Sequence, residues 1–332
     1  MKKTIISALG ALALIVGLPV CAMAQELTLG GQPVGIELQT EGVTVAGFAE
    51  VSTADGPHSP AKEAGVHEGD RIVEVGGRRV DSAEDFVSAV GELQGEAAVI
   101  TLRRGDESMT LSVQPAYSAD GQWMLGLWLR DQSSGIGTLT FYDPASGVYG
   151  ALGHGVTDET SGRTQEIRGG QITDAQIVDV RPGSPGVPGE LSGCADRGCV
   201  LGDIEKNTDK GIYGAACAAL GEGSAEVGTP APGPASILTT LEGRSVRAYK
   251  VEISRVYTED GTQRMLLTVT DPLLRELAGG IVQGMSGSPI LQDGKIVGAV
   301  THVLVSDPCR GYGISIRDML DEAGIAAQDL AA

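Results

Sequence analysis

The sequence predicts a mainly β chain with two domains, and three observations support this prediction. Glycine is frequent, at 49 of 332 residues, while aromatic residues make up 4%, which favours turns and short strands over long helices. Short apolar runs alternate with turn residues along most of the chain. The pattern changes at the polar stretch 117–122, where a part with helical patterns gives way to short strands alone. With 42% hydrophobic residues, the chain is long enough for two packed cores.

The first 24 residues have the pattern of a targeting segment. Lys2 and Lys3 precede an apolar run over residues 5–20, and residues 22–24 form a small-x-small cleavage pattern. We therefore expect export across a membrane, with this segment either removed as a signal peptide or kept as an anchor. No later stretch is long and apolar enough to span a bilayer.

Charge and cysteine content narrow the function classes. The net charge of −19 argues against nucleic-acid binding, which needs a basic surface, and favours a solvated acidic surface. An even number of cysteines in an exported chain allows disulfides, and free buried thiols are the alternative. Zinc is disfavoured because no two-residue cysteine spacing or paired histidine is present. We expect no metal and no organic cofactor. The four cysteines beyond the targeting segment are Cys194, Cys199, Cys217 and Cys309.

The first domain is expected over residues 25–117 and has mixed elements. An apolar strand at 43–48 is followed by a polar loop and by a short helix over 59–66 that ends at a glycine. A second helix runs from 82 to 93, with Ser82 as its cap and Asp85 at the capping-box position. A hairpin then pairs 98–103 with 109–113 around a Gly-Asp turn. This order predicts a small α+β domain.

The motifs of this first domain resemble a PDZ domain of the bacterial type. They are Ser-Pro-Ala at 59–61, Ala-Gly-Val at 64–66 and Gly-Asp-Arg-Ile at 69–72. The resemblance implies that Val34, Gly35 and Ile36 form a carboxylate-binding loop. Their amides would hold a peptide C-terminus, and the peptide would add as a strand beside 43–48. The alternative is a PDZ fold that packs on its own neighbour and binds nothing.

The second domain is expected over residues 118–332 and consists mainly of short strands. Segments 137–143 and 148–152 flank a turn, and later strands are expected at 176–180, 247–256 and 265–269. Loops rich in glycine and proline lie between them, at 181–193 and 221–234. Regularly spaced short strands with turn signals predict a sandwich or a barrel. A final helix is expected over 316–323.

A glycine-flanked serine is the strongest chemical signal. Ser286 lies in Gly-Met-Ser-Gly-Ser-Pro at 284–289, ahead of a predicted hairpin closed at Asp293-Gly294. Small neighbours let the backbone turn sharply and leave the hydroxyl exposed. The amides of Gly284 and Ser286 are placed to form an oxyanion hole, as around the nucleophile of trypsin-like serine peptidases. The alternative is an ordinary turn between strands.

A serine nucleophile needs a base, and histidine is the usual one. His154 lies between two glycines at a strand end, where its side chain would face a cleft, so we predict it as the base. His302 follows the strand after Ser286, and we expect it to be structural. Acids that could orient the imidazole are Asp158, Asp174, Asp179 and Asp271, and periodicity does not choose among them.

Three longer motifs resemble the stage IV sporulation protein B (SpoIVB) peptidase family over residues 30–320. They are Tyr-Gly-Ala-Leu-Gly-His-Gly at 149–155, Gly-Ile-Tyr-Gly at 211–214, and the run from 279 to 289 around Ser286. The resemblance implies a PDZ-like domain followed by a trypsin-like double β-barrel, with a triad of His154, Asp271 and Ser286. Asp271 also precedes Pro272, a favoured first helical residue, so a helix cap is its alternative role.

The family resemblance also implies a function. It indicates a serine endopeptidase that cleaves a membrane-bound regulator of an intramembrane metallopeptidase and so activates a late sigma factor during sporulation. The expected location is outside the cytoplasm, in the forespore intermembrane space or at the cell surface. Two alternatives remain open at this point: an inactive PDZ-bearing binding protein, and a general quality-control peptidase of the exported compartment.

Overall fold

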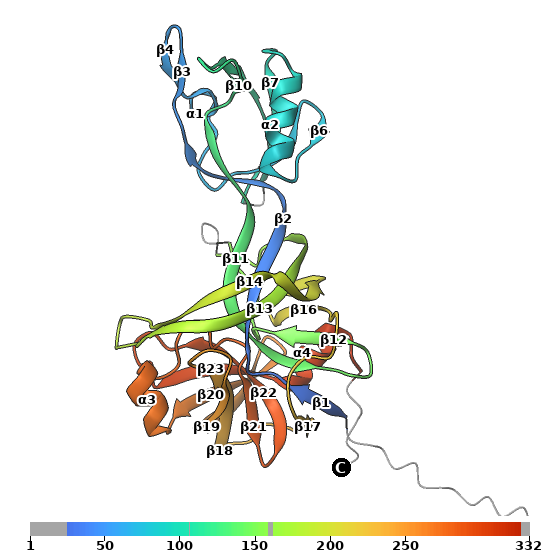
Figure 1. Ribbon diagram of the computed structural model, residues 1–332, viewed down its shortest axis with the longest axis vertical. Coiled ribbons are helices and arrows are strands. Elements are labelled where there is room, and N and C mark those ends of the chain that lie inside the picture. Colours follow the sequence, from blue (N-terminus) through green and yellow to red (C-terminus); the bar gives the residue numbers. More distant parts are fainter. Residues whose placement is uncertain (1–24, 106, 159–161, 327–332) are drawn as a thin grey trace, which may run out of the picture.

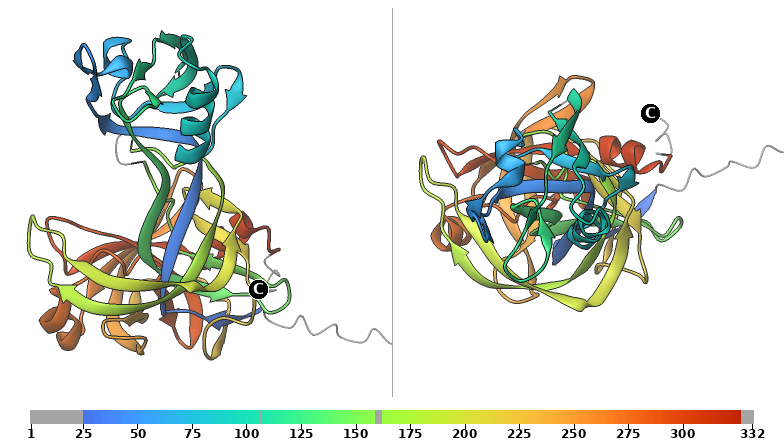
Figure 2. Two further views of the ribbon diagram at one scale, coloured as in Figure 1. Left: turned by 45° about the horizontal axis from the view of Figure 1, so that its top comes forward. Right: turned by 90° about the horizontal axis from the view of Figure 1, so that it is seen from above.

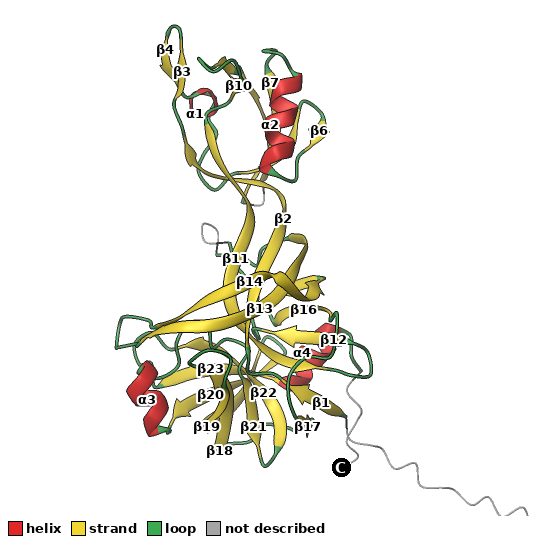
Figure 3. Cartoon of the chain, in the orientation of Figure 1, coloured by secondary structure: helices red, strands yellow, loops and turns green. Residues whose placement is uncertain are grey.

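The computed structural model describes residues 25–105, 107–158 and 162–326, so the predicted targeting segment lies outside the described residues. It confirms a mainly β chain. Two bodies are joined by a long two-stranded ribbon, as Figures 1 and 3 show. In the described part of the chain, no helix has the length and apolar character needed to cross a bilayer.

The ribbon consists of strands β2 (Pro33–Phe48) and β11 (Leu127–Tyr142), each 16 residues long. They pair antiparallel from Leu127 opposite Phe48 to Thr138 opposite Pro33. The register shifts between Arg130 and Gln132, a bulge that increases the local twist. Because β2 enters the upper body and β11 leaves it, the upper body is an insertion between two strands of the lower body (Figure 2).

The upper body contains a small sheet in the order β11-β2-β5-β7-β8, covered by helix α2. Ser82 caps α2 as predicted, because its hydroxyl accepts a hydrogen bond from the Asp85 amide at 3.0 Å. Phe86 and Val90 of this helix are buried against the sheet. The elements are β3 (Val51–Thr53), β4 (Gly56–His58), α1 (Pro60–Glu63), β5 (Arg71–Val75), β6 (Arg78–Arg79), α2 (Ala83–Glu92), β7 (Ala98–Arg104), β8 (Glu107–Val113), β9 (Ala116–Tyr117) and β10 (Trp123–Met124).

The lower body contains two barrels, and the first is built on the lower halves of β2 and β11. Its strands follow one another in the order β2-β11-β12-β16-β14-β13, and β13 pairs back onto β2. A bridge between Gly202 and Ala216 connects β14 to the end of β16 and closes the ring. The further strands are β12 (Val148–Ala151), β13 (Ile167–Arg181), β14 (Glu190–Ile204) and β16 (Gly211–Ala215), with β1 (Glu26–Leu29), β15 (Lys206–Thr208) and β17 (Ser224–Glu226) at the margin.

The second barrel is closed and antiparallel, in the order β18-β19-β20-β23-β22-β21. The predicted hairpin at Asp293-Gly294 is confirmed: it joins β21 to β22, and both turn residues have positive φ. A cluster of buried aliphatic side chains fills its interior. The elements are β18 (Gly233–Thr240), β19 (Val246–Glu259), β20 (Thr262–Val269), α3 (Pro272–Ala278), β21 (Pro289–Gln292), β22 (Lys295–Val303) and β23 (Arg310–Ser315).

The predicted C-terminal helix is confirmed as α4 (Ile316–Ala323), and it links the barrels. Its buried residues Ile316, Met319 and Leu320 share one cluster with Phe141 of the first barrel and Ile296 of the second. Apolar burial of this kind contributes roughly 1.5–3 kcal/mol per large side chain. The two barrels are therefore packed as one unit, with the ribbon rising from the first.

The structure places residues 26–40 differently from the expected boundary of the first domain. Val34 and Leu38 belong to the core of the first barrel, together with Leu139 and Tyr149. At the other end, residues 123–130 complete the upper body, because Leu125 and Leu127 pack into its core. The sequence did not indicate this because register between strands about 90 residues apart leaves no local signal.

Candidate active site

Ser286 lies in a turn between α3 and β21, where the first barrel holds the backbone. The Thr138 amide donates to the Ser286 carbonyl at 3.1 Å, and the Thr138 hydroxyl donates to the Gly284 carbonyl at 2.8 Å. Gly287 has φ +97°, and a Cβ there would lie 2.1 Å from the Thr138 carbonyl oxygen. Only glycine allows the two barrels to approach this closely at the turn.

The predicted oxyanion hole consists of two amides of this same turn. Thr138 donates to the carbonyls of both Gly284 and Ser286. The amides of these two residues donate to no other residue that the structure describes. Gly284 and Ser286 both line a mainly apolar cavity of the lower body. Two amides of this kind can stabilise a developing oxyanion without reorganising.

His154 comes from the first barrel, just after β12. Leu152 and Gly153 both have positive φ, which turns the chain at the strand end. The His154 Nδ1 lies 2.7 Å from the Gly155 carbonyl oxygen. Since a carbonyl only accepts, Nδ1 carries the proton and Nε2 keeps its lone pair. Burial lowers the pKa of His154, while the bond to Gly155 opposes this shift. The imidazole is therefore in the tautomer that a general base needs.

His302 packs against His154, which the sequence did not predict. The ring centroids are 4.3 Å apart and the planes are tilted by 31°. Burial, repulsion by protonated His154 and, to a smaller extent, the charge of Arg264 lower the pKa of His302 to about 4. His302 is thus neutral when His154 acts as a base. The available signal was its position at the end of β22, the strand that follows the serine turn.

His154, Ser286 and His302 line one cavity of about 550 Å³ between the barrels. Its described lining carries no aspartate, glutamate, lysine or arginine. The Ser286 hydroxyl donates to the Thr301 carbonyl at 2.6 Å, so it must turn from Thr301 toward His154 before proton transfer. Aliphatic side chains dominate the walls, and they are Ile36, Ile136, Leu152, Val156, Ile281, Val282, Val303 and Val305.

Asp271 does not line this cavity in the conformation described. One carboxylate oxygen accepts from the Leu273 and Leu274 amides, at 2.9 and 3.2 Å, and the other accepts from the Lys250 amide at 3.1 Å. These bonds lower the pKa of Asp271 against the opposing effect of burial. The helix-cap role is confirmed, since Asp271 is the N-cap of α3. Its triad role stays a prediction that this arrangement does not support.

The other candidate acids also lie away from the imidazole. Asp174 pairs with Arg244, Asp179 is on the exposed side of β13, and Asp158 lines a separate polar cavity. The group that contacts the His154 Nδ1 is therefore the backbone carbonyl of Gly155. No residue-type pattern could have indicated a main-chain acceptor.

Val34, Gly35 and Ile36 do not form a carboxylate-binding loop. They are in β2 between β11 and β13: Gly35 pairs with Ile136 on one side and with Thr173 on the other. All three are buried in the first barrel. A strand paired on both edges has no amides to offer a peptide, so the predicted assignment is wrong for this physical reason.

A groove suited to a peptide instead lies between α2 and the start of β11. It encloses about 380 Å³. Phe86, Val87 and Val90 form its helix side, and Leu127 and Leu129 form its strand side. The turn before β11 contains Gly126 with φ +72°, and a Cβ there would lie 2.5 Å from the Ala49 carbonyl oxygen. The signal in the sequence was Leu-Gly-Leu at 125–127, an apolar-glycine-apolar order like that at 34–36.

The four described cysteines are free thiols. Cys194 and Cys199, expected as a possible small loop, are both exposed on β14. Within the described ranges, no group of three or more histidine, cysteine, aspartate or glutamate side chains is arranged to hold a metal ion.

Comparison with known families identifies both bodies of the chain. The family model for SpoIVB peptidase S55 matches residues 121–320, and a PDZ model matches residues 51–104. The chain belongs to the SpoIVB peptidase S55 family. The PDZ domain is inserted into the first barrel of this chain.

Individual relatives match only parts of this SpoIVB-family chain. Serine protease HTRA1 of Xenopus tropicalis is 41% identical over 59 residues, which cover 18% of the chain and 13% of the relative. The chain spans about a quarter or less of the length of the curated relatives it matches first.

Two solved structures are similar to parts of the chain. The PDZ domain of an SdrC-like protein from Listeria monocytogenes has 25% identity, a TM-score of 0.23, and coverage of 28% of this chain and 93% of its own. Rv3671c of M. tuberculosis, an inactive serine-to-alanine mutant, has 13% identity, a TM-score of 0.31, and coverage of 59% and 84%.

Proposed function

We propose that this SpoIVB-family peptidase is an endopeptidase that cuts a membrane-associated regulatory protein outside the cytoplasm. In the family role, the cleavage releases an intramembrane metallopeptidase and activates a late sigma factor during sporulation. The observation that carries the proposed chemistry is the meeting of His154 and Ser286 with the Gly284 and Ser286 amides around one cavity. The targeting pattern of residues 1–24 supports the location.

The mechanism follows from the positions of these groups. The Ser286 hydroxyl leaves the Thr301 carbonyl, and Nε2 of His154 takes its proton as the oxygen attacks the peptide carbonyl. The Gly284 and Ser286 amides hold the oxyanion, and removing one such donor costs about 10²- to 10³-fold in turnover. The Nδ1–H of the imidazolium continues to donate its hydrogen bond to the Gly155 carbonyl.

The second half of the reaction uses the same groups. The His154 imidazolium gives its proton to the leaving amine, and the acyl-enzyme remains on Ser286. Water then enters and attacks the acyl carbonyl while losing a proton to His154. As the bond to Ser286 breaks, His154 returns that proton to the Ser286 oxygen and the new carboxyl end leaves. The apolar walls of the cavity favour an apolar side chain beside the scissile bond.

The test is direct cleavage by protein that lacks residues 1–24. The purified peptidase is incubated with the ectodomains of membrane-anchored regulators, and the products are identified by mass spectrometry. We expect one or a few defined cuts that are absent with Ser286→Ala. Cuts spread over any unfolded protein would support a quality-control peptidase instead, and no hydrolysis of any peptide would contradict the proposal.

A further inference from the structure

Strand β11 has an outer edge without a strand partner along the stretch that links the two bodies. Its inner edge pairs with β2 from Leu127 to Thr138, and its outer edge pairs with β12 only from Leu139 onward. Between Leu127 and Ile136, the described residues include no strand on that outer side. An unpaired edge is a template onto which an extended peptide can add as a further strand.

Both cavities suited to a peptide lie on this same stretch. Leu127 and Leu129 line the groove beneath α2, while Ser133 to Ile136 line the catalytic cavity that contains Ser286. One strand therefore connects the PDZ groove to the nucleophile. Neither lining contains an aspartate, glutamate, lysine or arginine among the described residues, so both ends favour apolar side chains.

The upper end of the groove is built to hold a terminal carboxylate. The Leu125 carbonyl accepts from the Ala61 amide at 2.9 Å, and the Gly126 carbonyl accepts from the Ala49 amide at 3.0 Å. In a trans peptide the following N–H points opposite to the carbonyl. The amides of Gly126 and Leu127 are therefore directed away from those partners, toward the groove, where consecutive amides form an anion-binding nest.

Direction and distance follow from this end point. A peptide that adds antiparallel to β11 with its C-terminus at Gly126 has its upstream residues beside 129, then 133–136. Leu127 and Ser134 are seven positions apart, and Leu127 and Ile136 are nine. At about 3.3 Å per residue, these intervals span about 23–30 Å.

We infer that the substrate is held by its own free C-terminus in the PDZ groove and is cut about 8–10 residues upstream of that terminus. This inference rests on the proposed peptidase function and names its substrate class: polypeptides with an apolar C-terminal residue and an apolar residue beside the scissile bond. The shared strand β11 sets the interval between the two sites.

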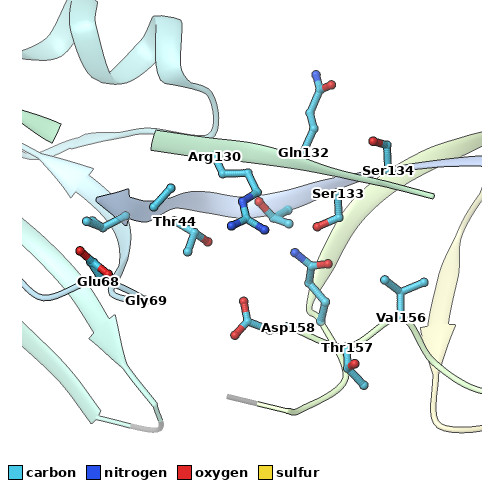
Figure 4. Close-up of a pocket in the computed structure, with 14 residues that line it drawn as sticks. Thr44, Glu68, Gly69, Arg130, Gln132, Ser133, Ser134, Val156, Thr157 and Asp158 are labelled. Atoms are coloured by element: carbon cyan, nitrogen blue, oxygen red, sulfur yellow. The ribbon is translucent and has the colours of Figure 1, made fainter. Parts of the chain in front are cut away.

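A polar cavity borders the middle of this path. It determines which substrate side chains are favoured between the PDZ groove and the catalytic cavity. Figure 4 shows it beneath the ribbon, with Arg130 and Ser133 directed toward it and Glu68 and Asp158 on its walls. It encloses about 390 Å³ and shares Ser133 and Ser134 with the catalytic cavity. Side chains on that face of an added strand meet polar groups, so polar residues are favoured in the middle of the interval.

The first experiment varies the C-terminus and the interval. Synthetic peptides with one apolar cleavage site are compared as free acids and as C-terminal amides, with about 4, 9 or 16 residues after that site. We expect the free acid with about 9 residues to be cut best, and amidation to raise its KM about tenfold or more. Equal cleavage of acid and amide, or no dependence on the interval, would overturn the inference.

The second experiment blocks the groove and leaves the peptidase intact. Val87 is 62% exposed and lines the groove, whereas Val99 is 48% exposed on β7 and does not. Val87→Asp is expected to raise KM for the long free acid about tenfold, and Val99→Asp to leave it unchanged. A short acyl-peptide amide that cannot reach the groove should be hydrolysed equally by both. If Val87→Asp leaves KM for the long acid unchanged, docking in this groove is refuted.

A binding measurement tests docking in the groove separately from the proposed peptidase function. The Ser286→Ala protein is titrated with free-acid and amidated peptide, and the fluorescence of Trp123 in the groove is followed. Tighter binding of the acid, by about tenfold, supports docking even if hydrolysis is never seen. Equal affinities refute docking even if every peptide is cut. Failure of the peptidase alone appears as loss of hydrolysis of the short substrate.

Discussion

The two ends of the β2–β11 ribbon are built differently. In the PDZ domain β11 is an edge strand beside α2, and its outer edge stays without a strand partner among the described residues down to Ile136, whereas from Leu139 onward it pairs with β12 in the barrel wall. Strand β2 differs from β11, because it has a second partner in both bodies: β5 above and β13 below. The comparison teaches that one strand can present an open edge to a binding groove and to a catalytic cavity, while its neighbour, paired on both edges, holds the two bodies together.

The largest expected effect concerns the catalytic cavity at the lower end of the ribbon. Ser286→Ala should lower hydrolysis of every substrate about 10⁶-fold, because nucleophile and base act as one unit. His154→Ala should be as inactive, and the double variant no slower. Ser288→Ala is the matched control: Ser288 is in the same turn and fully buried, and its hydroxyl has no partner in the described structure. Activity of Ser286→Ala near that of this control would exclude Ser286 as nucleophile.

The next effect tests whether the two ends are independent. Asp70 is 1% exposed and accepts two bonds from Arg104, both at 2.7 Å. Asp70→Ala should destabilise the PDZ domain by about 3 kcal/mol, because Arg104 and the His67 amide both lose the buried carboxylate to which they donate. Arg79→Ala, which removes a surface pair, is the control and should cost under about 1 kcal/mol.

Both tryptophans, Trp123 and Trp128, are in the PDZ part, so denaturation followed by fluorescence reports on that domain. Hydrolysis of a short peptide reports on the peptidase in the same sample. We expect Asp70→Ala to lower the denaturation midpoint reported by the tryptophans and to leave the hydrolysis of the short peptide unchanged. Equal loss of both would show that the ribbon makes the bodies a single cooperative unit.

Asp271 gives a smaller effect that decides its role. As the cap of α3, Asp271→Ala should cost about 1 kcal/mol of stability, while Asp271→Asn should keep most of the cap and turn over within a few-fold of the parent. A carboxylate that orients the imidazole would give a different result, a loss of about 10⁴-fold in the asparagine variant. Turnover of the folded asparagine variant, measured by single-turnover kinetics, separates the two roles.

The smallest effect concerns the pH profile. The pKa of His154 is lowered from 6.5 by burial, and among the residues that the structure describes no carboxylate bonds to its ring to raise it. Since the base must be unprotonated, kcat/KM should rise with pH through a midpoint below 6.5 and then stay level. His302→Phe keeps the stacked ring and should preserve kcat, whereas His302→Ala should lower kcat a few-fold with KM unchanged. A midpoint at or above 7 would indicate a carboxylate at Nδ1.

Local chemistry made some features predictable. The Ser82 cap, the Asp293-Gly294 turn and the final helix each depend on neighbouring residues, and all three are confirmed. The serine and histidine motifs likewise led to side chains that line one cavity.

Features that depend on distant pairing were not predictable. Residues 34–36 have the composition of a PDZ loop, but pairing with β11 and β13 places them inside a barrel. The contact between His154 and His302 joins residues 148 positions apart, since 302 − 154 = 148, and nothing local indicates it. The acceptor for Nδ1 is a main-chain carbonyl, which every residue has.

Because the PDZ domain is an insertion, it could be deleted or replaced without changing the barrel below. Its entry and exit points are adjacent, because the Thr40 hydroxyl contacts the Asp131 carbonyl at 3.3 Å. A two-residue hairpin turn could join β2 to β11 at that point and leave the barrel register below unchanged. Another small domain with adjacent ends could be grafted at the same position, so the recognition of a substrate tail and the cutting chemistry can be exchanged independently of each other.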